Sequence, residues 1–210
     1  AVSITEKIHG TNFRCGWVPS VADTWWKKVK KFFGRLESHE FVYGSHNVQL
    51  TNKFIRTNGY YEKLGVGNVY AKIVKQYQLQ DKLKKGEVLY GEIYGDGIQK
   101  NYVYGCKQGE HKLVVFDLMV DGQYCSPAQM TGWCDMVDLT HVPILYWGPF
   151  SLEHAKKLTE GNSVLCPTQK VREGVVIKPA EETNHPHLGR KVLKLISDAY
   201  LLDKQNTDNH

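Results

Sequence analysis

Short strand-like segments separated by glycine turns, rather than alternating strands and helices, are the feature that most constrains the fold of this chain. Gly95, Gly97 and Gly105 mark turns between successive strands, as in an antiparallel meander. We therefore expect an α+β fold in which antiparallel sheets are flanked by helices. The expected strands are 2–9, 12–17, 41–50, 87–95, 102–105, 111–119, 142–146, 173–178 and 191–197, and the expected helices are 24–37, 68–82, 127–137, 151–160 and one from 198 onward.

The chain is long and apolar enough to bury a core as one domain, because its 210 residues are 41% hydrophobic. It has no run of about 18 apolar residues, so we expect no membrane span. Its five cysteines are odd in number and form no CxxC pair, which argues against a disulfide scaffold or a zinc site and favours free thiols in an intracellular compartment. The formal charge of +5 fits a polyanionic partner, although many proteins with this balance bind no nucleic acid.

The first strand-like segment carries a lysine and a histidine next to a glycine turn. Val2, Ile4 and Ile8 alternate with polar residues, which predicts a strand with one buried face. Lys7 and His9 would share the other face, about 7 Å apart along the strand. Most strand lysines are solvated, but burial or a nearby cation can hold a lysine neutral and make it a nucleophile. The segment therefore indicates a function only if other parts of the chain supply residues that could act together with Lys7.

Four later strand-like segments supply charged or aromatic residues: Leu89–Gly95 around Glu92, Val114–Leu118 around Phe116, Arg172–Pro179 with Glu173 and Lys178, and Val192–Ser197 with Lys194. In this order the five segments resemble the motifs of the covalent nucleotidyltransferases, the superfamily of ATP-dependent DNA ligases, RNA ligases and mRNA-capping guanylyltransferases. The first motif, Lys-x-His-Gly-Thr-Asn from Lys7 to Asn12, is similar to the RNA ligase version. DNA ligases and capping enzymes usually have Lys-x-Asp-Gly, with an arginine at the position of Asn12.

The resemblance implies the adenylyltransferase domain of an ATP-dependent RNA ligase, with an ATP-grasp-like fold that holds ATP between two sheets. In this chemistry Lys7 attacks the α-phosphate of ATP, releases pyrophosphate and forms a lysyl-AMP. The AMP then passes to a 5′-phosphate end, and a 3′-OH displaces it to seal the strand. A free lysine has a pKa near ~10.4, so nearby cations or a metal would be needed to lower it. Mg²⁺ or Mn²⁺ is the expected ion, and RNA or RNA/DNA strand ends in RNA repair are the expected partners.

The resemblance also implies which residues bind the nucleotide. Glu92 would accept hydrogen bonds from the ribose hydroxyls, and Phe116 would stack on adenine. The main chain around Glu6 would read the adenine amino group, and Asn12 would position the RNA end or the phosphates. Without the motif order, Glu92 would be a partly exposed strand glutamate and Phe116 a core residue.

A second set of residues would act on the reacting phosphate. Glu173 would hold the metal through a coordinated water, and Lys194, whose neighbouring leucines point the other way, would contact the α-phosphate. His9 would help hold the metal, by orienting its bound water, or would assist sealing; a plain hydrogen-bonded strand histidine is the alternative. Lys178 would bind the nucleotide, but a regular strand places it on the face opposite Glu173, so both can face the nucleotide only if a twist or bulge occurs near Pro179.

Two motifs depart from the usual pattern. RNA ligases commonly have Ser-Arg after the first motif, whereas this chain reads Gly-Ser-His-Asn at 44–47, and the imidazole of His46 cannot replace a bidentate guanidinium. The last motif lacks its second lysine, because Ile196 stands at that position. Lys191 or Arg190 would have to compensate.

Other functions stay open beside the RNA ligase hypothesis. A DNA ligase, a capping-type guanylyltransferase and a catalytically silent RNA- or nucleotide-binding module are the alternatives. We expect residues 1–210 to form one nucleotidyltransferase domain, without the oligonucleotide-binding (OB) barrel that follows this domain in DNA ligases. Either the molecule is a minimal ligase, or the barrel precedes Ala1, as in RNA ligases whose OB domain is N-terminal. A monomer is expected.

Overall fold

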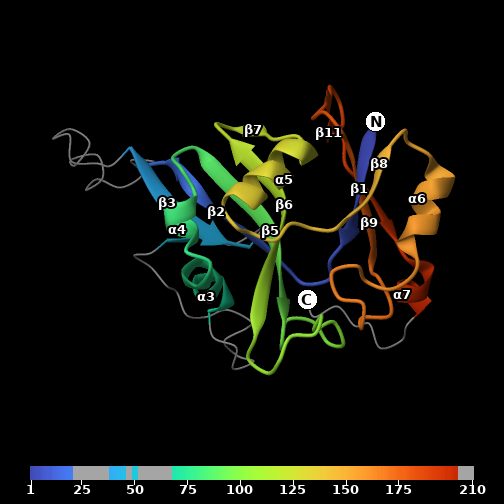
Figure 1. Ribbon diagram of the computed structural model, residues 1–210. Helices are drawn as coiled ribbons and strands as arrows, with labels where there is room; N and C mark the ends of the chain where they lie inside the picture. The colour runs from blue at the N-terminus through green and yellow to red at the C-terminus, as the bar shows by residue number, and fades with distance from the viewer. Residues whose placement is uncertain (21–37, 46–48, 52–67, 203–210) are drawn as a thin grey trace.

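The computed structural model describes residues 1–20, 38–45, 49–51 and 68–202, which form two antiparallel sheets flanked by helices (Figure 1). The smaller sheet has the strand order β12-β9-β1-β8 and consists of β1 (Val2–Lys7), β8 (Ile144–Gly148), β9 (Gly174–Pro179) and β12 (Leu193–Ile196). The larger sheet has the order β4-β3-β2-β5-β6-β7 and consists of β2 (Thr11–Pro19), β3 (His39–Gly44), β4 (Gln49–Thr51), β5 (Glu87–Gly95), β6 (His111–Val120) and β7 (Gln123–Tyr124). A separate hairpin joins β10 (Asn184–His185) to β11 (Gly189–Arg190).

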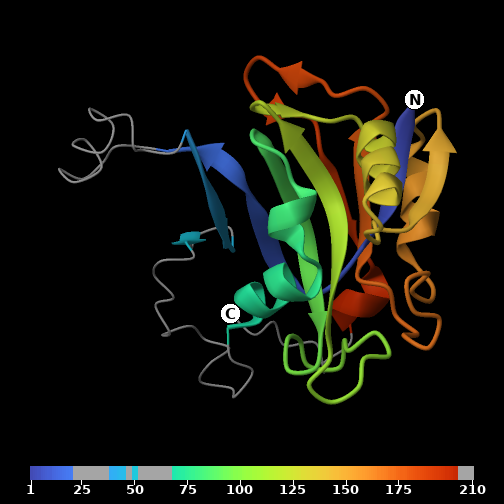
Figure 2. The ribbon, with the colours of Figure 1, turned by 60° about the vertical axis from the view of Figure 1, so that its left-hand side comes forward.

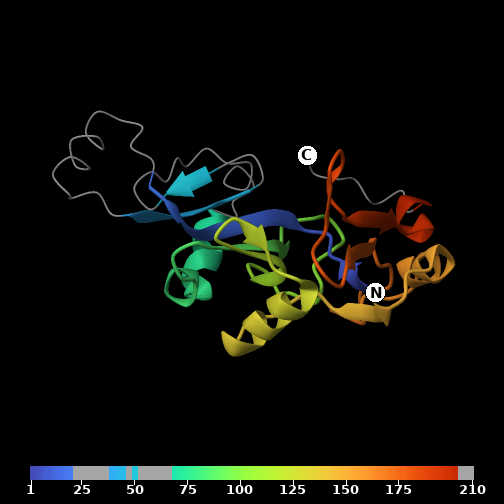
Figure 3. The same cartoon turned by 90° about the horizontal axis from the view of Figure 1, so that it is seen from above.

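Helices cover the outer faces of both sheets. The larger sheet packs on α3 (Val69–Gln76), α4 (Leu79–Lys82) and α5 (Pro127–Met136), which lie on one side of it in Figure 2 and Figure 3. The smaller sheet packs on α6 (Leu152–Thr159), and α7 (Asp198–Leu202) follows β12. Ser151 caps α6, since its hydroxyl accepts the N–H of His154. No helix among the described residues is long and apolar enough to cross a membrane.

Alternation along β2 and β5 separates a core face from a cavity face. Phe13 and Leu89 are fully buried and pack in the core beneath the helices. Asn12, Arg14 and Glu92 point to the opposite face and line a cavity between the sheets. Because side chains alternate along a strand, one face of the larger sheet packs against the helices and the other lines the cavity.

The chain crosses from the smaller to the larger sheet at the turn between β1 and β2. Gly10 is required there, because an added Cβ would lie 2.2 Å from the carbonyl oxygen of Ile93. A second core fills the junction of the sheets and contains Ile8, Tyr94, Tyr102, Tyr104, Val114, Val142 and Tyr200. This turn holds the C-terminal end of β1 against the larger sheet.

Three expected elements differ from the structure. Residues 102–105 form turns rather than a strand, because Tyr104 and Gly105 have left-handed φ values of 46° and 71°. The expected helix 68–82 is interrupted at Gln78, which is also left-handed, so it divides into α3 and α4. The expected strand 41–50 ends at Gly44, and β4 is separate. The expected helix 24–37 lies outside the described residues.

The burial of β1 also differs from the expectation of one buried face. Ser3, Thr5 and Glu6 are buried, as is Ile4. The reason is topological: β1 lies between β9 and β8 in the sheet and is covered on both faces. Thr5 and one carboxylate oxygen of Glu6 find hydrogen-bond partners inside the protein, whereas Ser3 Oγ and Glu6 Oε1 have none among the described residues.

Candidate active site

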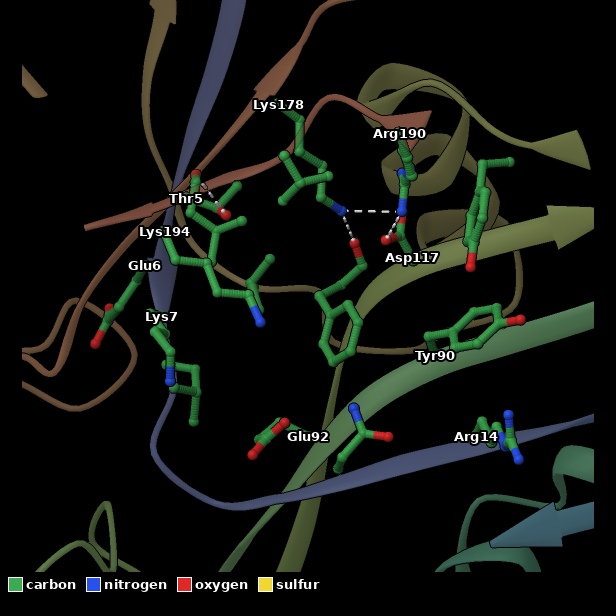
Figure 4. Close-up of a pocket in the computed structure, with 17 residues that line it drawn as sticks. Thr5, Glu6, Lys7, Arg14, Tyr90, Glu92, Asp117, Lys178, Arg190 and Lys194 are labelled. Atoms are coloured by element: carbon green, nitrogen blue, oxygen red, sulfur yellow. Dashed lines mark hydrogen bonds and ion pairs between the residues drawn. The ribbon is translucent and has the colours of Figure 1, made fainter. Parts of the chain in front are cut away.

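A cavity of about 430 Å³ lies between the two sheets (Figure 4). Residues far apart in the chain line it, and they include most of the residues predicted to act on a nucleotide: Glu6, Lys7, Asn12, Glu92, Phe116, Lys178 and Lys194. Glu173 and His9 are buried next to Lys7. The tertiary structure therefore brings the predicted site residues together.

Lys7 and Glu173 form a close ion pair at one end of the cavity. The distance from Lys7 Nζ to Glu173 Oε1 is 2.5 Å, and Glu173 is buried whereas Lys7 is partly exposed. The second carboxylate oxygen, Oε2, is buried without a hydrogen-bond partner among the described residues. A lysine amine attacks only with a free lone pair, so a nucleophilic Lys7 would first have to lose a proton from its ammonium group.

Glu173 reaches Lys7 because it lies outside the regular strand. It precedes β9, so the strand parity that relates it to Lys178 does not apply. The next residue, Gly174, has a φ of 153°, and a Cβ there would lie 2.1 Å from the carbonyl oxygen of Leu195. The glycine lets β9 start tightly against β12, and both Glu173 and Lys178 can then approach the site without a bulge near Pro179.

Glu92 faces this ion pair from β5 across the cavity (Figure 4). Burial raises the pKa of Glu92 to about 8, the positive charge of Lys7 lowers it, and the negative charge of Glu173 raises it. Near neutral pH the carboxyl is therefore largely protonated, and it can donate one hydrogen bond as well as accept others.

His9 lies behind the ion pair, in an aromatic enclosure. Its main-chain N–H donates to the hydroxyl of Tyr104 at 2.8 Å, and its ring is in edge contact with Tyr102 and Tyr200. The ring atom Nδ1 is 3.7 Å from Glu173 Oε1. His9 is therefore positioned beside the carboxylate rather than in the wall of the cavity.

The side chain of Glu6 has a structural task. Its Oε2 accepts the main-chain N–H groups of Val164 and Leu165 at 2.8 and 3.1 Å, which ties the loop after α6 to β1. The main chain of Glu6 donates its N–H to the carbonyl of Pro143 at 2.9 Å. In Figure 4 the side chain of Glu6 points away from Glu92 and Lys194.

A bulge in β6 brings two successive residues to the cavity. Asp117 pairs with Tyr90 and Val115 pairs with Gly91, so Phe116 is the extra residue between them. Phe116 and Asp117 then both line the cavity, although a regular strand would point them to opposite faces.

Lys178 is held by this bulge. Its Nζ donates to the carbonyl of Phe116 at 2.6 Å and pairs with Asp117 Oδ1 at 2.9 Å. Burial lowers the pKa of Lys178, and the neighbouring Asp117 raises it. The Nζ atom is also 5.8 Å from the centre of the Phe116 ring, so the predicted adenine-stacking residue and the predicted nucleotide-binding lysine form one unit.

Arg190 completes a buried charge network that sequence reasoning did not find. It forms two hydrogen bonds to Asp117, of 2.5 and 2.9 Å, and its Nε donates to Glu182 at 2.8 Å. Its guanidinium lies 3.8 Å from the ring centre of Tyr124. Because its donors bind carboxylates, Arg190 is poorly placed to replace the missing lysine of the last motif. The sequence contains one sign of this network: Asp117 is the only charged residue in the apolar run 114–118, and a charged residue in a buried strand needs an opposite charge nearby.

Lys194 points into the cavity from β12, whereas the neighbouring Leu193 is 55% exposed and Leu195 packs in the core. Its predicted orientation agrees with the structure. Lys191 is not among the residues that line the cavity, and His46 lies outside the described residues. The part of the chain that the structure describes contains no group of three or more His, Cys, Asp or Glu side chains arranged to hold a metal ion.

The fold is similar to that of solved RNA ligases. A variant of Naegleria gruberi RNA ligase with ATP and Mn has a TM-score of 0.65 and 19% sequence identity, and the match covers 95% of this chain and 50% of that one. The same ligase with PPi gives a TM-score of 0.64 at 20% identity, and a further variant with AMP and Mn also gives 0.64 at 20%, both with the same coverage. This chain therefore spans about half the length of these relatives. Comparison with curated protein sequences gave no match.

The RNA ligase family model matches residues 1–196. The chain belongs to the RNA ligase family.

Proposed function

We propose that this chain is the adenylyltransferase domain of an ATP-dependent RNA ligase, which forms a lysyl-AMP on Lys7 and joins 5′-phosphate to 3′-OH ends. The observation that carries the proposal is the placement of Lys7 Nζ at the cavity, 2.5 Å from Glu173 and facing Glu92, in a chain of the RNA ligase family. The related structures contain ATP, AMP, PPi and Mn, which fits the proposed substrate, intermediate, product and ion.

The nucleotide is proposed to lie along the cavity from Lys7 towards Lys178. A volume of about 430 Å³ is in the usual range for a small-molecule site. Glu92 would bind the ribose hydroxyls, Phe116 would stack on adenine, and the main chain of Glu6 would meet the adenine edge. Asn12 and Lys194 would contact phosphate, with Lys194 supplying positive charge where charge builds up during attack.

The chain has a carboxylate suited to a divalent ion. The buried Oε2 of Glu173 lacks a partner among the described residues, and an oxygen of this kind is a ligand that Mg²⁺ or Mn²⁺ prefers. Glu173, with His9 beside it, would hold the ion through water, and the bound ion would neutralise phosphate charge. Glu173 would then exchange its contact with Lys7 for the new one, and the Lys7 ammonium would lose its proton to water before attack. His9 would keep the carboxylate oriented during this exchange.

The proposal extends to the organisation of the protein. Residues 1–210 would form a single nucleotidyltransferase domain of ATP-grasp-like fold, without an OB barrel. The domain would act as a monomer on RNA or RNA/DNA strand ends. The described cysteines are all free thiols, in keeping with an intracellular setting.

Intact-mass measurement after incubation with ATP and Mg²⁺ tests the function directly. We expect a covalent adduct of one adenylate, and we expect Lys7→Ala to form none. Lys157→Ala is the matched control, because this lysine lies on α6 and its side chain is 72% exposed. Equal labelling with GTP would instead indicate capping chemistry. A folded chain that binds ATP but never forms the adduct would be a silent nucleotide-binding module.

A further inference from the structure

The cavity continues beyond the groups assigned to ATP chemistry. Figure 4 shows Lys7, Glu92 and Lys194 towards one end and Arg14, Tyr90 and Arg190 towards the other. Arg14 on β2 is the register partner of Tyr90 on β5, so both side chains leave the sheet at the same level. Tyr124 from β7 also lines this second end. None of these three residues has a task in the proposed adenylylation.

Arg14 differs from the other arginines that the structure describes. Arg172 donates to the carbonyls of Leu158 and Asn162 at 2.6 and 2.8 Å, and Arg190 is bound by two carboxylates. Within residues 1–20, 38–45, 49–51 and 68–202, the side chain of Arg14 has no hydrogen bond or ion pair, although it is half-buried in the cavity wall. A half-buried guanidinium with no acceptor among the described residues is a suitable binding group for an anion from outside, and its fork of N–H donors matches a phosphate.

Tyr90 and Tyr124 line the cavity together with Arg14. The ring centres of Tyr90 and Tyr124 are 5.6 Å apart at a 42° tilt, and the guanidinium of Arg190 lies 3.8 Å from the ring centre of Tyr124. Burial raises the pKa of Tyr90 to about 12, so its hydroxyl keeps its proton at neutral pH. Proteins usually bind single-stranded nucleic acid with aromatic rings beside cationic side chains. The bases stack on the rings, and the cations attract the phosphates of the backbone.

We propose that Arg14, Tyr90 and Tyr124 form a subsite for one nucleotide of the RNA strand, some distance along the strand from the joined end, with Arg14 on its phosphate and the tyrosines against its base or sugar. This inference rests on the proposed ligase function. The strand is favoured over ATP as the source of the phosphate, because Lys194 and Asn12 already serve ATP at the Lys7 end of the cavity. A polynucleotide attached there has further phosphates to place along the larger sheet.

The test separates ATP chemistry from RNA contact in the same variants. Arg14→Ala, Arg14→Lys and the control Lys157→Ala would each be assayed for self-adenylylation with ATP. They would also be assayed for binding of a 5′-phosphorylated oligoribonucleotide at several salt concentrations. Thermal unfolding of each variant checks that it is folded, and Arg14→Lys keeps the charge should Arg14→Ala fail to fold.

Arg14→Ala is expected to weaken oligoribonucleotide binding about tenfold, and to lower the slope of log affinity against log salt by about 0.7, the value for one lost phosphate contact. The loss in adenylylation is expected to be much smaller than this. The RNA affinity of Arg14→Lys should lie between those of Arg14→Ala and the unsubstituted chain, because lysine keeps the positive charge but lacks the paired N–H donors of the guanidinium. Lys157→Ala should match the unsubstituted chain in both assays.

Two results would overturn the subsite. One is unchanged RNA affinity and salt slope in Arg14→Ala, or no measurable RNA binding by the unsubstituted chain. The other is an equal loss of adenylylation and RNA binding, which would assign Arg14 to ATP. Both differ from failure of the proposed function itself, which would appear as no adenylate adduct on the unsubstituted chain.

Discussion

The two charge clusters of the cavity are built in opposite ways. In the Lys178–Asp117–Arg190–Glu182 network each charged group meets an opposite charge, and Asp117 serves two cations at once. In the Lys7–Glu173–Glu92 cluster, one oxygen of Glu173 has no partner among the described residues, and the pKa of Glu92 is raised to about 8. Groups that satisfy each other hold a fixed geometry, whereas groups left unsatisfied can bind a substrate or move a proton. We therefore propose that the first cluster mainly holds the shape of the cavity and that the second carries out the chemistry.

The largest expected effect comes from breaking the scaffold. Asp117→Ala should lower the free energy of unfolding by about 3–5 kcal/mol, because it leaves Lys178 and Arg190 without their shared carboxylate in a buried site. Urea denaturation measures the loss. Glu153→Ala removes one partner of an exposed i,i+4 pair and should change stability by less than about 0.5 kcal/mol. Equal effects in the two variants would contradict the comparison.

Glu173→Gln tests the chemical cluster. The variant should lower the rate of self-adenylylation at least about a hundredfold, since it removes the charge proposed to hold the ion and to release Lys7. Its stability should change by less than about 1 kcal/mol, because Lys7 is partly exposed and can be hydrated. Single-turnover labelling and denaturation on the same sample provide both numbers. A variant that loses stability but keeps activity would place Glu173 in the scaffold.

The pH dependence of stability tests the Lys7–Glu173–Glu92 cluster, because the pKa of Glu92 is raised there. A carboxyl whose pKa is raised in the folded state, here to about 8, holds a proton that the unfolded chain has already lost. Stability should therefore fall as the pH rises between about 4.5 and 8, by at most about 1.4 kcal/mol per pH unit from this group. Glu92→Gln should remove that contribution, which denaturation at a series of pH values can measure. An identical pH profile in the two proteins would show that Glu92 ionises as it does in water.

The smallest effect is expected from Arg190→Lys, which keeps the charge of the scaffold but loses the bidentate contact with Asp117. A loss of about 1–2 kcal/mol of stability is expected, with adenylylation reduced less than in Glu173→Gln. Combining it with Asp117→Ala in a double-mutant cycle would show whether the two residues act together. Additive losses would mean that their contact contributes little.

Much of the architecture could be predicted from local patterns. The alternation of Asn12 and Arg14 with Phe13 is visible in the sequence and assigns the faces of β2. The orientation of Lys194 follows from the same rule. Turns were less predictable, because the left-handed conformations of Gln78 and Tyr104 depend on packing rather than on these side chains.

Several features of the site could not be predicted from such local patterns. The alternation of side chains along a strand could not show that Glu173 precedes β9, or that a bulge at Phe116 brings Asp117 to the cavity. It also could not show that Asp117 meets Arg190, since the two are 73 positions apart and belong to different elements.

From the sequence alone came the strands, the ordered motifs and the residues able to carry the chemistry, because strand periodicity and side-chain type are local properties. Only the tertiary structure decided which charges satisfy one another and which, like Arg14 and one oxygen of Glu173, lack a protein partner among the described residues. The physical reason is that pairing depends on distances between strands that are remote along the chain, and those distances exist only after the two sheets have packed together.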